Sequence, residues 1–89
     1  MQTTKRVTII KANGETSVLL PDKKPDLKQM QTWVGGLIEP MHIRYNGKAA
    51  TMVVNEEGLL ESLEMNLVAS RIAGQVVVGD VFILEGWRL

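Results

Sequence analysis

The amino-acid sequence predicts an α+β fold, with a small mixed or antiparallel sheet of about five to six strands and two short helices packed on it. Three observations lead to this class. Several segments alternate apolar and polar residues and are rich in β-branched side chains, as half-buried strands are. Asn-Gly pairs at 13–14 and 46–47 are typical of hairpin turns. Two short stretches carry apolar residues at helical spacing and end at glycines.

The length and the charge balance of the chain limit its architecture and its partners. With 89 residues the chain has room for one domain, which we place at 1–89. So short a chain buries only about three-fifths of its unfolded surface, and self-association would add to this. Hydrophobic residues make up 45% of the chain and charged residues 22%, which predicts a folded protein. Ten basic and ten acidic side chains cancel, which disfavours a nucleic-acid partner.

The residue types that are missing point to a cytoplasmic protein. Cysteine is absent, which excludes a disulfide framework, a thiolate metal site and a cysteine nucleophile. No run approaches eighteen apolar residues, and residues 1–11 lack the order of basic, apolar and small residues that marks a secretory signal. We therefore expect a location in the cytoplasm, which is the host cytoplasm if the protein is phage-encoded, and no membrane partner.

The first twenty residues are predicted to form a hairpin. Residues 6–11 alternate, which places Val7 and Ile9 on one face of a first strand. Residues 17–20 form the returning strand. This strand ends at Pro21, because proline has no N–H for a central ladder.

The first helix is predicted to run from Pro25 to Val34. Pro25 suits the first helical position because its φ is already helical and its missing N–H has no partner there anyway. Asp26 adds a favourable charge in the first turn. Leu27, Met30 and Val34 form one apolar stripe, which requires a sheet to cover it.

A second hairpin is predicted from strand 37–45 and strand 50–55. Pro40 suggests that the first of these strands starts at a sheet edge, where a second subunit or a peptide can add. Glu39 falls on the apolar face of this strand unless a bulge at Pro40 shifts the phase. An acid at this position is either paired or exposed at the start of the strand.

The remainder of the chain is predicted to be a loop, a short helix and a buried strand. The helix spans residues 67–73, with Asn66 as its N-cap and Gly74 as its stop signal. Residues 75–78 are predicted to be extended. Residues 81–85 are predicted to form a central strand, because four consecutive apolar residues imply burial on both faces, by helices on one side and by strands or another subunit on the other.

A search for catalytic chemistry favours a binding role over an enzyme. The sequence contains no phosphate-loop, dinucleotide-binding, zinc-protease or serine-hydrolase signature. His42 is the only histidine, and without cysteine or a second histidine it cannot complete a zinc site or a catalytic triad. The acidic pair Glu56 and Glu57 lacks the ligand count that calcium demands. We therefore predict no catalytic residue, no metal ion and no cofactor.

Four sequence blocks resemble a small domain family that is common in phages, plasmids and other mobile elements and is catalogued as a domain of unknown function. The blocks are residues 34–39, 53–59, 66–74 and 78–84, and the resemblance covers residues 33–84. The positions similar to the family pattern are Gly35, Gly36, Glu39, Asn55, Glu56, Gly58, Asn66, Gly79 and Asp80. Residues 62–65 depart from it, since a proline-bearing loop is expected there. The resemblance implies a phage context and no chemistry.

Small phage proteins without catalytic motifs often act against host defence. By this analogy we predict a homo-oligomer that sequesters a nucleotide immune signalling molecule in pockets between its subunits. The candidate ligand-binding residues offer a ring for a base, cations for phosphate and polar groups for ribose, and they are Trp33, Gly35, Gly36, Glu39, Arg44, Tyr45, Asn55, Arg71 and Asp80. Two of these have a simpler reading, with Trp33 as a lid on the helix end and Arg71 as a partner of the helix dipole.

The alternative prediction is a protein-protein inhibitor or accessory module that acts on a host protein. It rests on the edge strand that contains Pro40 and on the apolar C-terminal segment. A third hypothesis, enzymatic cleavage of a signalling nucleotide, would require turnover that depends on His42 or on the acidic pair at 56–57.

Overall fold

The computed structural model describes residues 4–89. The first three residues of the stretch considered above for a secretory signal lie outside this range. The elements within it are β1 (Arg6–Ile10), β2 (Thr16–Leu19), α1 (Leu27–Val34), β3 (Ile38–Tyr45), β4 (Lys48–Asn55), α2 (Leu67–Ala73) and β5 (Val81–Glu85). The ends of β1 to β4 differ from the predicted ones by at most two residues, and both ends of β5 are as predicted.

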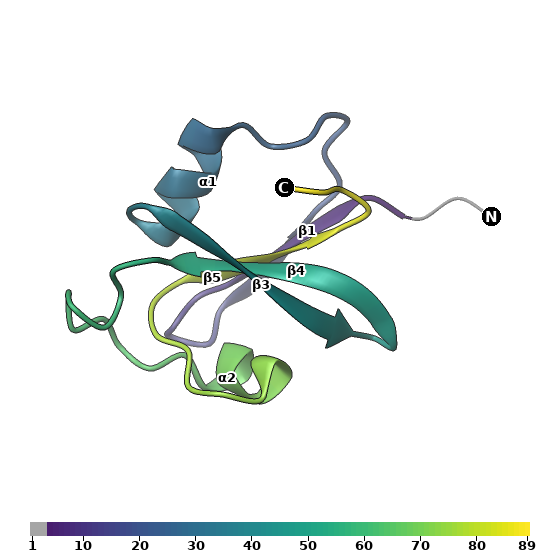
Figure 1. The fold of residues 1–89 in the computed structure, drawn as a ribbon. Coiled ribbons are helices and arrows are strands. Elements are labelled where there is room, and N and C mark those ends of the chain that lie inside the picture. Colours follow the sequence, from purple (N-terminus) through teal and green to yellow (C-terminus); the bar gives the residue numbers. More distant parts are fainter. Residues whose placement is uncertain (1–3) are drawn as a thin grey trace.

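The strands form one five-stranded sheet in the order β2-β1-β5-β4-β3, and every neighbouring pair is antiparallel (Figure 1). This confirms the α+β class and settles the sheet as antiparallel. β5 is central, as predicted, because β1 and β4 pair with its two sides. β2 and β3 are the edges, so the placement of Pro40 on an edge strand is also confirmed.

The two helices cover opposite faces of the sheet (Figure 1). On one face, Met30 and Val34 of α1 pack with Phe82 in a core cluster that also contains Val7. On the other face, Ala69 of α2 packs in a second cluster, whose members from the strands are Ile10, Met52, Val54, Val81 and Ile83. β5 is therefore buried on both sides by helices of its own chain, which corrects the prediction that strands or another subunit cover one side.

The tight turn between β3 and β4 fits the hairpin prediction. Asn46 and Gly47 have φ values of 54° and 77°, and a two-residue turn of type I′ requires positive φ at both positions. The turn sets the register, in which Tyr45 faces Lys48.

The start of α1 differs from the prediction. The helix begins at Leu27, and Asp26 is its N-cap with extended backbone angles (φ −80°, ψ 169°). The carboxylate of Asp26 accepts a hydrogen bond from the backbone N–H of Gln29 at 2.8 Å. Pro25 is therefore buried before the helix and is not its first residue. A side chain that accepts from the first turn fixes the helix start more strongly than the preset φ of proline.

The segment after α2 does not form the extended segment of the sheet that was predicted for residues 75–78. Its one ladder contact is an isolated bridge between Met65 and Val78. The backbone N–H of Val77 instead donates to the Ser70 hydroxyl at 2.8 Å, and that hydroxyl donates to the carbonyl of Val77 at 3.2 Å. These bonds hold the segment against α2. The loop predicted after β4 and the limits of α2 are confirmed.

Candidate functional site

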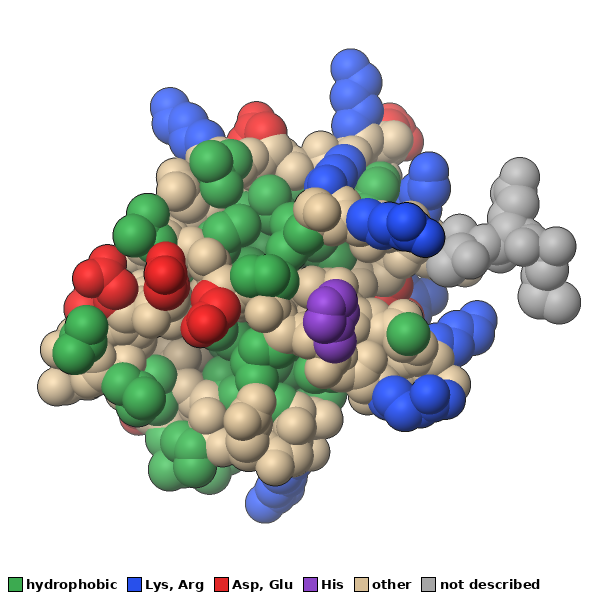
Figure 2. All heavy atoms as spheres, viewed as in Figure 1, with side chains coloured by type: hydrophobic (Ala, Val, Ile, Leu, Met, Phe, Trp, Pro, Cys, Tyr) green, Lys and Arg blue, Asp and Glu red, His purple; other side chains and the backbone are tan. Residues whose placement is uncertain are grey.

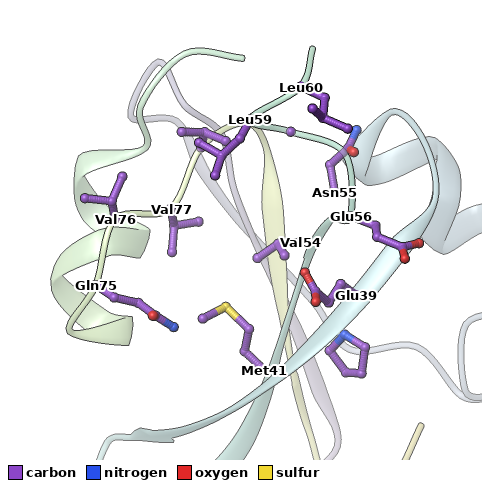
Figure 3. Close-up of a pocket in the computed structure, with 13 residues that line it drawn as sticks. Glu39, Met41, Val54, Asn55, Glu56, Leu59, Leu60, Gln75, Val76 and Val77 are labelled. Atoms are coloured by element: carbon purple, nitrogen blue, oxygen red, sulfur yellow. The ribbon is translucent and has the colours of Figure 1, made fainter. Parts of the chain in front are cut away.

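A groove of about 600 Å³ lies on the α2 face of the sheet (Figure 3). Its walls come from the β3–β4 pair, from the loop after β4 and from the segment after α2. The lining residues are Glu39, Pro40, Met41, Val54, Asn55, Glu56, Gly58, Leu59, Leu60, Gln75, Val76, Val77 and Val78. We call this hollow the apolar groove, because most of these side chains are hydrophobic.

The floor of the apolar groove is part of the core, whereas its walls are open to solvent. Val54 and Val77 belong to the core cluster on the α2 face, and Met41 packs against it. On the walls, Leu60 is 84% exposed and Val76 is 66% exposed. Large apolar side chains on both sides of the groove are therefore exposed to solvent, whereas the floor between them is packed.

The loop that carries the exposed leucines is fixed by hydrogen bonds. The side-chain oxygen of Asn55 accepts from the backbone N–H of Glu57 at 2.8 Å, and the carbonyl oxygen of Asn55 accepts from the N–H of Gly58 at 3.2 Å. Gly58 is required by close packing, because a Cβ at this position would lie 2.8 Å from the Cγ2 atom of Val78. The exposure of Leu59 and Leu60 is therefore a feature of an ordered loop.

The charged groups at the rim of the groove are acidic. Glu39 and Glu56 line it and are both exposed, and no lysine or arginine lines it. The ion pairs of residues 4–89 are Arg6 with Glu85 and Lys11 with Glu15, so neither rim carboxylate is neutralised within the described chain. Figure 2 shows a group of acidic side chains on the left of the molecule, and others at its top. Of the two alternatives for Glu39, the structure shows exposure at the start of its strand.

Four of the nine predicted ligand-binding residues meet at a different hollow. Trp33, Gly35, Asn55 and Asp80 line a space of about 330 Å³ beside the end of α1. The ring of Trp33 stands edge-on to that of Phe82, with the centroids 5.1 Å apart and an interplanar angle of 69°. Trp33 is thus held on the core cluster of α1, as the reading of a lid on the helix end requires.

The polar members of this group already have partners. The Asp80 carboxylate accepts a hydrogen bond from the backbone N–H of Ala12 at 2.9 Å. The side-chain amide of Asn55 donates to the carbonyl of Val34. Gly36, another of the nine predicted residues, does not line this hollow. A Cβ at Gly36 would lie 2.9 Å from the side-chain amide nitrogen of Asn55, so Gly36 packs closely against that amide. These contacts connect separate segments of the chain.

The other predicted residues lie apart from this hollow. Glu39 belongs to the apolar groove, and the exposed Arg71 is on α2. Tyr45 packs against the core cluster on the α2 face. Arg44 lies near the β3–β4 turn, where its guanidinium donates to the carbonyl of Gly47 at 3.0 Å. The nine residues therefore do not form a single site in one copy of the chain.

The described residues offer no metal centre. Among residues 4–89, no three His, Cys, Asp or Glu side chains lie close enough together to hold a metal ion. The same part of the chain contains no helix with the length and hydrophobicity needed to span a membrane.

Comparison with known proteins identifies the family. The family model described as "Domain of unknown function (DUF3846)" matches residues 5–87. The chain belongs to this family. The DUF3846 match includes the β1–β2 hairpin and the end of β5, both of which lie outside the resemblance at 33–84. No curated protein and no solved structure matches the chain.

The sequence of this DUF3846 domain predicts a loop at Leu59 and Leu60 and an extended segment at Val76, and neither prediction gives these groove-wall residues a role in binding. A usable signal was present, since two adjacent leucines directly follow the polar turn at 55–58. Apolar pairs in an otherwise polar loop are candidates for contact with a partner.

Proposed function

We propose that this DUF3846 domain is a non-enzymatic module that holds a segment of a partner protein in its apolar groove. The observation that carries this proposal is the exposure of Leu59, Leu60 and Val76 around one groove with a packed floor. An exposed apolar patch rimmed by polar groups is typical of a protein-interaction site. Burial of these three side chains against a partner would supply the main driving force for association.

The acidic rim selects the chemistry of the partner. Glu39 and Glu56 favour a segment whose apolar side chains are flanked by lysine or arginine. The free edge of β3 lies beside the groove and gives such a segment a second way to bind, by adding a strand to the sheet. Pro40 removes one backbone donor from β3, so strand addition supplements the groove and does not replace it.

The resemblance to a family of mobile elements suggests where the partner comes from. In a phage context the partner is a protein of the host, and the domain acts against host defence by covering a functional surface of that protein. This is the inhibitor reading of the sequence analysis, and the exposed groove walls support it.

A capture experiment tests the protein-binding proposal. The immobilised domain is exposed to host lysate beside two variants, Leu60→Ser in the groove wall and Leu20→Ser after β2. Both leucines are strongly exposed, at 84% and 68%, so neither change disturbs the core. We expect one polypeptide to be retained by the wild type and by Leu20→Ser and lost by Leu60→Ser. Equal retention by all three, or by none, contradicts the proposal.

Sequestration of a nucleotide signalling molecule by a homo-oligomer is the second candidate function. The carboxylates at the rim of the apolar groove repel phosphate, so a nucleotide would have to bind elsewhere. One observation favours this candidate. On the opposite face of the sheet, a hollow combines Trp87 and Arg88, which can receive a base and a phosphate.

A thermal-shift screen against linear and cyclic nucleotides tests this second candidate. A ligand present at a hundred times its dissociation constant stabilises the folded chain by about 2.7 kcal/mol. For a domain of this size each kcal/mol moves the midpoint by roughly 4–8 °C. One nucleotide that gives such a shift and is recovered unaltered supports sequestration, and an unchanged midpoint with every nucleotide rejects it.

A further inference from the structure

A hollow of about 560 Å³ lies on the face of the sheet that α1 covers only in part. Its floor is a cross-strand row, in which His42 of β3 pairs with Thr51 of β4, and Thr51 pairs with Leu84 of β5. Paired residues of neighbouring strands point to the same face. The segment after β5 forms the wall through Trp87 and Arg88. We call this space the basic hollow.

The basic hollow exists because small side chains meet a part of the sheet that α1 leaves open. Met30 and Val34 of α1 pack in one cluster with Val53 and Phe82, a cross-strand pair two residues further along the strands than Thr51 and Leu84. Beyond that point the β3–β4 pair carries the small residue Ala49, which also lines the space. Its volume falls within the range of roughly 300–1,000 Å³ that is usual for small-molecule sites.

The electrostatic character of this hollow is opposite to that of the apolar groove. Arg88 and His42 line it, and no aspartate or glutamate does. Arg44 lies two residues after His42 on the same strand and therefore faces the same side of the sheet. In Figure 2 the histidine lies between a group of acidic side chains on the left and several basic side chains on the right. An anionic group is thus favoured here.

An aromatic ring is held in place at the same hollow. Trp87 packs against the core cluster of α1 and also lines the hollow. The ammonium group of Lys5 lies 6.0 Å from the centroid of this ring and adds a further positive charge. A ring that the core orients before binding loses little freedom when a flat ligand stacks on it.

We propose that the basic hollow binds a nucleotide. Trp87 stacks on the base, Arg88 pairs with the phosphate, and the hydroxyl of Thr51 hydrogen-bonds the sugar or an edge of the base. This inference rests on the second candidate function and deepens it by naming the site. The basic hollow and the apolar groove lie on opposite faces of the sheet and share only Pro40 of the edge strand β3 among their lining residues.

Calorimetric titration of the full chain with AMP and GMP tests the proposal, with adenosine and inorganic phosphate as half-ligands. We expect each nucleotide to bind at least tenfold more tightly than either half-ligand. Arg88→Gln is expected to weaken AMP at least tenfold and to leave adenosine unchanged, because it removes only the phosphate partner. Trp87→Leu is expected to weaken AMP and adenosine alike. Lys24→Gln, which removes an exposed positive charge from the connector before α1 outside the hollow, serves as the control and leaves all of these affinities unchanged.

The outcomes separate the site from the function. If AMP or GMP binds and Arg88→Gln and Trp87→Leu bind as the wild type does, the basic hollow is overturned and sequestration is left to another site, such as the hollow beside Trp33. If neither nucleotide binds at millimolar concentration and the cyclic nucleotides also fail, the site and the sequestration function both fall. Since Arg88 is exposed, Arg88→Gln still reports if Trp87→Leu does not fold. A short RNA that binds more tightly than AMP and depends on Arg88 supports the site and identifies RNA as the source of the nucleotide.

Discussion

The side-chain amide of Asn55 donates a hydrogen bond to the carbonyl oxygen of Val34, with nitrogen and oxygen 3.2 Å apart. This bond joins the last residue of β4 to the last residue of α1. Gly36 lies against the same amide, where a Cβ would come within 2.9 Å of the nitrogen. Two residues that the family resemblance singled out therefore have a structural role, which is to seat the end of α1 on the sheet.

Gly36→Ala and Asn55→Ala are expected to be coupled. Gly36→Ala costs about 1–3 kcal/mol because the new methyl group displaces the Asn55 amide. Asn55→Ala costs about 1–3 kcal/mol because it leaves buried backbone groups without their partner. The double variant is expected to cost less than the sum, since the methyl group then has room. Urea unfolding of the four proteins measures these free energies, and additive losses would show that the close approach is relieved by other means.

The two helix caps are expected to differ greatly in their contributions to stability. Asn66 is buried, its amide donates to the carbonyls of Ile10 and Gly79 at 2.9 Å each, and its oxygen accepts from the N–H of Ala69. Asn66→Ala removes the cap and both donors and should cost about 2–4 kcal/mol. The side chain of the exposed cap Asp26 accepts a single hydrogen bond, from the backbone N–H of Gln29. Asp26→Ala should cost about 0.5–1 kcal/mol.

Chemical denaturation of these two variants provides the measurement. A separate variant, Asn66→Asp, retains the capping oxygen and loses the two donors. We expect it to unfold at a denaturant concentration far below that of the wild type. Wild-type stability for Asn66→Asp would contradict a role for the two donors.

The acidic rim of the apolar groove predicts a salt dependence of partner binding. Once a partner segment is known, neutralising both rim acids in Glu39→Gln with Glu56→Gln should weaken binding about two- to tenfold at low salt. The loss should shrink as salt is added, because exposed charges are screened over about 10 Å at 0.1 M ionic strength. Glu57→Gln, an exposed acid of the same loop that does not line the groove, is the matched control. Titration at two salt concentrations checks this, and a loss that does not depend on salt rules out the charge argument.

The parts of the fold that were predicted correctly depend on local chemistry. The Asn46-Gly47 turn, the Asn66 cap and the glycine stop signals act over a few residues, so the sequence reveals them directly. The burial of β5 also followed from its own unbroken apolar run. The position of α1 on the face opposite α2 depends on packing between distant segments, which local patterns do not encode.

The candidate site was harder to predict for the same reason. Trp33 and Arg44 both suit a nucleotide by residue type. Trp33, however, lies at the end of α1 close to the start of β3, whereas Arg44 lies near the other end of that strand. The adjacent pair Leu59 and Leu60 marks a candidate for contact with a partner, but its exposure depends on how the loop packs, which local sequence does not encode. Trp87 and Arg88 join His42 only through the pairing of β4 with both of its neighbours.

The most direct test of the central claim is a calorimetric titration of the captured partner protein into the wild type, Leu60→Ser and Leu20→Ser. The structure predicts that Leu60→Ser lowers the affinity at least tenfold, because it removes an apolar side chain from the groove wall. Leu20→Ser, which is exposed beside the opposite edge strand β2, is predicted to bind as the wild type does. Equal affinities for all three proteins would contradict the claim that the apolar groove is the partner-binding site.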